Sequence, residues 1–198
     1  MEGLQIWAQP WWVNLLLLVP ALSYLYWRRT GLALNRWKLL ALLLFGAAFG
    51  FVEAAVVVYL RAAAGLANGS ISPQHSSTSY QQALLALAQF PGGLRRIELC
   101  REAATMVMLV TVALLAGAGA KARWGAFLWE FAAWDLAYYA GLRTMLGWPS
   151  SLKDYDVLFL IPVPWVAQVW FPLLVSSLSL LTVVLCRTEN ATRSRVRD

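Results

Sequence analysis

Ionisable side chains lie inside long apolar runs of this sequence. Glu98, Arg101 and Glu102 follow one another at i, i+3 and i+4, a spacing that puts them on one face of a helix. Glu53 and Asp135 stand in two further apolar runs. A charged side chain at the centre of a membrane helix costs about 2.5–3.5 kcal/mol, so it is expected to face protein or water and to have a partner. The pattern predicts a buried polar site between helices.

The candidate site has eight members, which are expected to meet in one half of a helical bundle. They are Glu53, Arg61, Glu98, Arg101, Glu102, Asp135, Tyr139 and Arg143. A guanidinium binds a carboxylate or a phosphate through two parallel hydrogen bonds. The set therefore suits both internal ion pairs and the capture of an anion.

Three functions and one purely structural role fit this set. The first function is a binding or accessory membrane subunit that recognises a small anion or a lipid headgroup through the arginines. The second is a proton-coupled transporter or proton relay that uses Glu53, Glu102 and Asp135. The third is an intramembrane enzyme with carboxylates as acid and base, although no nucleophile or cofactor motif accompanies them. The structural alternative is a network of ion pairs that only holds the helices together.

The sequence predicts no cofactor and no metal centre. Di-iron helical bundles use paired Glu-x-x-His motifs, but the only histidine here is His75, in a stretch rich in Gly, Ser, Asn and Thr. A metal site built from carboxylate oxygens alone is the one alternative that the acidic residues leave open.

The composition indicates a membrane protein. Of the 198 residues, 60% are hydrophobic and 13% are charged, whereas soluble domains have about 25% charged residues. The net charge of +6 does not predict a nucleic-acid partner, because Lys and Arg flank the apolar runs and form no continuous basic face. We expect an all-α, polytopic transmembrane bundle that forms a single domain. Membrane lipids are its expected surroundings, and other membrane subunits are candidate partners.

Five membrane spans are expected, because about 20 apolar residues cross the hydrocarbon core. They cover residues 11–27, 39–60, 97–118, 125–146 and 164–186. Gly46, Gly50 and Ala54 form a ridge of small residues that allows close helix packing, and Glu53 lies on the same face. Pro162 and Pro164 cannot donate backbone hydrogen bonds, so residues 157–163 are expected to be an interfacial or re-entrant piece rather than part of a span.

The loop charges predict an outside N-terminus and a cytoplasmic C-terminus. With that orientation the cytoplasmic side would hold ten Lys and Arg residues and the other side five. Residues 61–96 would form a long outer loop, in which 80–90 are expected to form an interfacial helix. Residues 187–198 would form a cytoplasmic tail.

Three stretches carry a resemblance to a known family. They are residues 96–106 (RIELCREAATM), 131–139 (FAAWDLAYY), and 147–150 (GWPS) followed by 156–165 (DVLFLIPVPW). Together they resemble an uncharacterised family of small bacterial polytopic integral membrane proteins. The resemblance implies a multi-pass location in the bacterial inner membrane, and it implies no particular activity.

Overall fold

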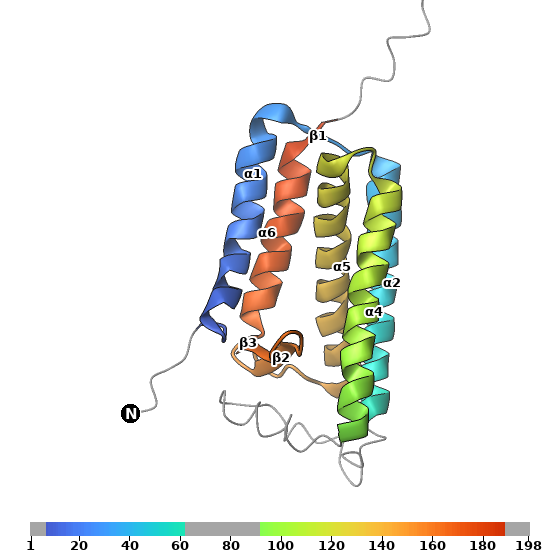
Figure 1. Cartoon of the computed structure of the whole chain (residues 1–198), viewed down its shortest axis with the longest axis vertical. Coiled ribbons are helices and arrows are strands. Elements are labelled where there is room, and N and C mark those ends of the chain that lie inside the picture. Colours follow the sequence, from blue (N-terminus) through green and yellow to red (C-terminus); the bar gives the residue numbers. More distant parts are fainter. Residues whose placement is uncertain (1–6, 62–91, 189–198) are drawn as a thin grey trace, which may run out of the picture.

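The computed structural model describes residues 7–61 and 92–188 of the chain, and these residues are mostly helical. The helices lie side by side along the long axis of the molecule (Figure 1). In the described residues the helical elements are η1 (Trp11–Leu17, a 3-10 helix), α1 (Leu18–Thr30), α2 (Arg36–Arg61), α4 (Gly92–Ala116), α5 (Ala120–Leu146) and α6 (Trp170–Cys186). Helix α5 is central, because it packs against α2, α4 and α6, while α1 packs against α6.

Short strands cover both ends of the bundle. At one end β1 (Leu32–Ala33) pairs in parallel with β4 (Arg187–Thr188). At the other end β2 (Tyr155–Phe159) and β3 (Trp165–Gln168) form an antiparallel hairpin. We call this second end the hairpin end of the molecule; it lies at the bottom of Figure 1.

The hairpin corrects the expectation of an all-α chain. Residues 157–163 belong mostly to β2 and the following turn, and the last helix begins at Trp170 rather than at residue 164. The physical reason is local. Pro162 and Pro164 lack the N–H group that a helix or a continuous strand needs, so the chain turns there and β3 runs back along β2.

The other boundaries differ less from the expected spans. The first apolar run divides into η1 and α1, and α4 and α5 each begin about one turn earlier than expected. Helices α2 and α4 are long and apolar enough to cross a membrane, whereas α6 has 17 residues. Most of the expected outer loop, with its helix at 80–90, and most of the tail lie outside the described residues.

Small residues bring α2 and α5 into backbone contact. A Cβ atom added to Gly46 would lie 2.5 Å from the carbonyl oxygen of Glu130, and one added to Gly50 would overlap the carbonyl group of Trp134. Gly141 of α5 faces α2 in the same way. The ridge of small residues expected from the sequence therefore does face a neighbouring helix, which is how such ridges act in membrane proteins.

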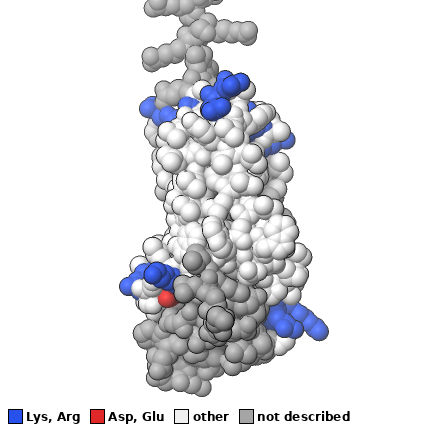
Figure 2. Space-filling model, turned by 90° about the vertical axis from the view of Figure 1, so that its left-hand side faces the viewer, with Lys and Arg blue, Asp and Glu red and all other residues white. Residues whose placement is uncertain are grey.

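The outside of the bundle is apolar between two charged ends. Large hydrophobic side chains are exposed along the helices, among them Leu22, Leu44, Val107, Leu115 and Leu185. On the face drawn in Figure 2, Lys and Arg lie near the two ends of the molecule, and the described surface between them carries no charged side chain. Only 28% of the most apolar part of α2 and 22% of that of α4 is buried inside the molecule.

Candidate functional site

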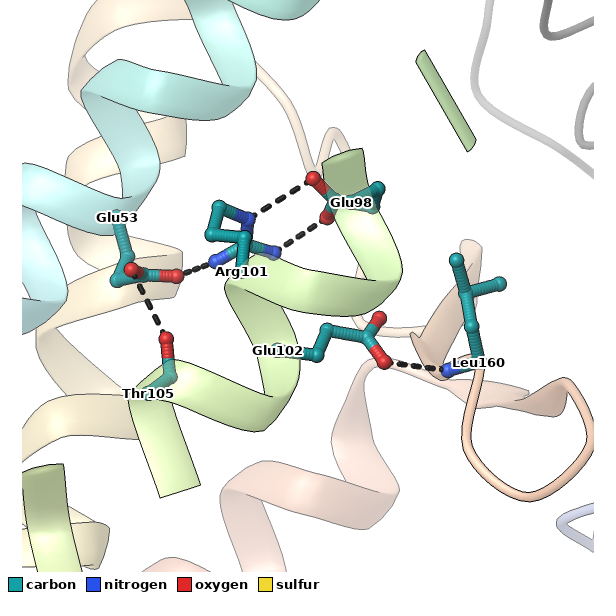
Figure 3. A network of polar contacts seen from close by, with 6 residues as sticks. All are labelled: Glu53, Glu98, Arg101, Glu102, Thr105 and Leu160. Atoms are coloured by element: carbon teal, nitrogen blue, oxygen red, sulfur yellow. Dashed lines mark hydrogen bonds and ion pairs between the residues drawn. The ribbon is translucent and has the colours of Figure 1, made fainter. Parts of the chain in front are cut away.

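Arg101 is the centre of a polar cluster on the hairpin half of α4. Its guanidinium pairs with Glu98 one turn earlier on the same helix, with Nε 2.9 Å from Oε2. It also forms an ion pair with Glu53 of α2 (Figure 3). One partly buried arginine therefore joins two helices through two carboxylates.

Glu53 reaches this cluster because of its place on α2. The residue follows Gly50 by three positions, so it lies on the helix face that packs into the bundle. Its side chain is buried, with 4% of the residue exposed. Besides the ion pair, its Oε1 accepts a hydrogen bond of 3.0 Å from the hydroxyl of Thr105 on α4. Glu53 is thus held from two positions of the neighbouring helix.

Glu102 connects the cluster to the β-hairpin. Its carboxylate accepts a 2.8 Å hydrogen bond from the backbone N–H of Leu160, which follows β2 (Figure 3). The residue is 6% exposed. This bond holds the hairpin against α4. We call Glu53, Glu98, Arg101, Glu102 and Thr105 the Arg101 cluster.

A second polar cluster lies where α5 meets α6 and β2. Asp135 of α5 is 7% exposed and accepts a 2.7 Å hydrogen bond from the hydroxyl of Ser176 on α6. The hydroxyl of Tyr139 donates to Oδ2 of Asp156 on β2 at 2.9 Å. Asp135 and Asp156 are close enough to interact electrostatically. We call Asp135, Tyr139, Asp156 and Ser176 the Asp135 cluster.

Tyr138 lies between the two clusters. It is within electrostatic reach of Arg101, and its ring makes an edge-on contact with Tyr139, with centroids 5.3 Å apart. On its other side it stacks on Trp134. The two clusters are therefore neighbours along one side of α5, joined by aromatic side chains.

The eight candidate residues divide into three groups. The Arg101 cluster contains Glu53, Glu98, Arg101 and Glu102, and the Asp135 cluster contains Asp135 and Tyr139. Arg143 joins neither set of contacts: it is exposed, and its guanidinium donates to the carbonyl oxygens of Gly147 and Pro149 at the end of α5. The backbone of Arg61 ends α2, and its side chain lies outside the described part of the structure.

The hydrogen bonds of Arg143 in the described structure are therefore local, to the backbone that follows α5, rather than to either cluster. A helix leaves its last carbonyl groups without intrahelical partners, and Arg143 lies one turn from the end of α5, where its side chain bonds the carbonyl groups of the turn that follows. The hydrogen bonds of the Arg143 guanidinium to these carbonyl groups compete with an ion pair to a carboxylate elsewhere in the bundle.

Partners contributed by distant segments were missed by sequence reasoning. Neither Ser176 nor Asp156 is among the eight candidate residues. Ser176 lies inside the apolar run of residues 164–186, which is a signal for a buried polar partner, whereas Asp156 follows Lys153 and Asp154 and has no such signal. Among the described residues, no group of three or more His, Cys, Asp and Glu side chains is arranged to hold a metal ion.

Acidic groups outnumber the available cations in this region. Two carboxylates share the guanidinium of Arg101, and Glu102 and Asp135 are held by neutral donors. Among the described residues the arrangement can bind protons more readily than an anion, because the partly buried guanidinium of Arg101 already has carboxylate partners.

Comparisons with family models, with curated proteins and with solved structures give no significant match to this chain.

Proposed function

We propose that the chain is a multi-pass membrane protein with five spans, an outside N-terminus and a cytoplasmic C-terminus. The exposed apolar surface between two charged ends supports a location in a membrane, because lipid tails would cover such a surface and headgroups would meet the charges. Membrane lipids would then surround the bundle, and other membrane subunits are candidate partners. The resemblance of three sequence stretches supports a location in the bacterial inner membrane.

We further propose that the two clusters bind and transfer protons, so that the protein acts as a proton-coupled transporter or a proton relay. The observation that carries this proposal is the group of three carboxylates, two of them buried (Glu53 and Glu102), around the guanidinium of Arg101. Buried carboxylates in membrane helices mark proton pathways, because they can change charge without moving far. Asp135, next to Asp156 and Tyr139, would be a second proton-binding position.

Recognition of an anion or a lipid headgroup is less well supported. Such a ligand would need a guanidinium with free donors facing it. The guanidinium of Arg101 pairs with two carboxylates, and that of Arg143 bonds two backbone carbonyl oxygens. An enzymatic role has no additional support from the two clusters.

Proton flux in liposomes tests the proposed function. The full-length chain would be reconstituted, a membrane potential imposed, and internal pH followed with a dye. Glu53→Gln and Asp135→Asn are expected to lower the flux by about 100-fold, the lower end of what a positioned proton-transfer group contributes. Ser177→Ala is the control. Ser177 is exposed and lies next to Ser176, the hydrogen-bond partner of Asp135, so this variant should conduct protons as fast as the wild type.

Three outcomes would contradict this proposal. Wild-type liposomes without proton flux would exclude a conducting role. A rise in melting temperature with phosphatidylglycerol or inorganic phosphate that disappears in Arg101→Ala would instead favour anion recognition. Substitutions that lower only expression and melting temperature, beside an inactive wild type, would leave the clusters with a purely structural role.

A further inference from the structure

Glu130 is a buried acidic residue that belongs to neither cluster. It lies on α5, five residues before Asp135 and about 7.5 Å from it along the helix axis. The residue is 0% exposed. Neither of its carboxyl oxygens has a hydrogen-bond partner among the described residues. A fully buried carboxyl group without a partner is costly and calls for a functional explanation.

The surroundings of Glu130 are mostly apolar, and the backbone of Ala113 is the polar group close to its carboxyl. The backbone of Ala113, on α4, comes close to the carboxyl group, and Ala113 forms a buried apolar cluster with Leu42 and Ala126. On α2 the backbone at Gly46 packs directly against the backbone of Glu130. An ionised carboxylate at this position would be shielded from water and would have no counter-charge close by among the described residues, which makes the charged form costly.

Charged groups lie only at some distance along each neighbouring helix. Between Lys38 and Glu53 on α2, and between Glu102 and the end of α4, the sequence has no ionisable residue. On α5 itself the nearest ones are Arg123 and Asp135, and α6 has only Cys186. Glu130 is thus the one acidic group in the middle of this interface.

Lys38 marks one end of a path through Glu130. Its ammonium group donates a 2.8 Å hydrogen bond to the carbonyl oxygen of Ala116, three residues after Ala113 on α4. Lys38 is exposed. Lys38 lies eight residues before Gly46 on α2, so a proton that leaves Glu130 toward this end would travel about 12 Å along the helix axis to the level of Lys38.

The Arg101 cluster marks the other end of the path. The buried residues of α4 follow one stripe, Glu102, Thr105, Leu109 and Ala113. Polar groups thus lie at both ends of the stripe, and Leu109, which is fully buried, separates them. On α5, Trp134 follows Glu130 at i+4 on the same face, and its indole N–H has no hydrogen-bond partner among the described residues.

We propose that Glu130 is a further proton-binding site, separate from both clusters, which exchanges protons with the Arg101 cluster across an apolar barrier formed by Leu109. A carboxylate oxygen of Glu130 would take up a proton arriving from the cluster, and the O–H bond would break again when water from the Lys38 end accepts the proton. No oxidation or reduction is involved. The inference rests on the proposed proton-transfer function and extends the path toward the cytoplasmic side.

Infrared spectroscopy and proton flux test this site with the full-length chain in liposomes. At neutral pH the wild type should show the carbonyl band of a protonated carboxylic acid that is weaker in Glu130→Gln and retained in Glu130→Asp. Proton flux should fall about 100-fold in Glu130→Gln, with a melting temperature close to that of the wild type, and part of the flux should return in Glu130→Asp.

A second variant tests the barrier. Leu109→Ala should raise the flux severalfold, because the space left behind would shorten the apolar gap. Val107→Ala, on the exposed side of the same helix, is the control and should leave the flux unchanged. An unchanged proton flux in Leu109→Ala would show that Leu109 does not limit proton transfer.

The outcomes separate this inference from the proposed function. Wild-type liposomes without flux would overturn the proposed function and the transfer step with it. Two results would overturn only the role of Glu130. One is a carboxylic acid band that is equally strong in the wild type and in Glu130→Gln. The other is a proton flux that Glu53→Gln abolishes but Glu130→Gln leaves unchanged.

Discussion

The Arg101 cluster and Glu130 are two acidic regions of one helix interface, and they differ in how their charge is balanced. In the cluster each carboxylate has a partner: a guanidinium, a hydroxyl or a backbone N–H group. Glu130 has no hydrogen-bond partner among the described residues, although it is more deeply buried. Burial alone therefore does not indicate what a carboxylate does. Its partners decide whether it can keep a negative charge.

The difference also concerns how the helices are held together. Helix α2 packs its backbone closely on α5, but it makes few contacts with α4. Glu53, which binds Arg101 and Thr105, connects it to α4 in the hairpin half, and Lys38 bonds the carbonyl oxygen of Ala116 near the other end. The cluster thus has a structural role in addition to any role in proton transfer, whereas Glu130 contributes no such connection.

Removing the central cation should have the largest effect on stability. Arg101→Ala leaves Glu53 and Glu98 buried or partly buried without their counter-charge, and such losses cost about 3–5 kcal/mol. We expect a strongly lowered melting temperature in mild detergent. The double variant Arg101→Met with Glu53→Gln should be more stable than Arg101→Ala, because it removes the orphaned charge as well. Equal melting temperatures for the two variants would contradict the inference that Arg101 stabilises the fold by balancing the charge of Glu53.

A methyl group at Gly50 should produce the next largest effect. Its Cβ would overlap the carbonyl group of Trp134, which cannot move without shifting α5. We expect a loss of about 2–3 kcal/mol, the upper part of the range for overpacking. Gly93→Ala is the matched control, because nothing lies within 4 Å of the added atom, and its thermal unfolding should match that of the wild type.

Loss of the Ser176 hydroxyl should have a moderate effect. Ser176→Ala removes the 2.7 Å hydrogen bond to the buried carboxylate of Asp135, and an unsatisfied buried acceptor costs about 1–2 kcal/mol. Ser177→Ala, one residue further along α6 and exposed, provides the comparison by thermal unfolding. If both serine variants unfold at the same temperature, the hydrogen bond does not stabilise the α5–α6 contact.

An apolar side chain at Glu130 should have the smallest effect on stability, and the opposite sign. Glu130→Leu removes a buried polar group that has no hydrogen-bond partner among the described residues, so we expect no loss and a gain of up to about 1 kcal/mol. Glu53→Leu should lose stability, because Arg101 would keep only one of its carboxylates. The melting temperatures of the two variants, measured side by side, should therefore differ in opposite directions from that of the wild type. A melting temperature lowered as much in Glu130→Leu as in Glu53→Leu would contradict this difference between the two carboxyl groups.

Much of the polar site could be predicted from local spacing. The strip of Glu98, Arg101 and Glu102 and the inward position of Glu53 follow from helical periodicity, which depends only on neighbouring residues. The hairpin of β2 and β3 was not expected, because a short apolar run with prolines fits a strand, a turn or a broken helix equally well. The use of Arg143 at a helix end, where its side chain bonds the backbone, was also not expected.

The amino-acid sequence by itself determined the apolar helices, the residues that share a helix face, and the small residues that allow α2 to approach α5. Each of these properties depends on residues within a few positions of one another, which the geometry of a helix relates directly. Only the tertiary structure decided which carboxylates have partners. The bonds from Thr105 to Glu53, from Leu160 to Glu102 and from Ser176 to Asp135 join residues 52, 58 and 41 positions apart, and the packing of whole helices decides which distant groups meet.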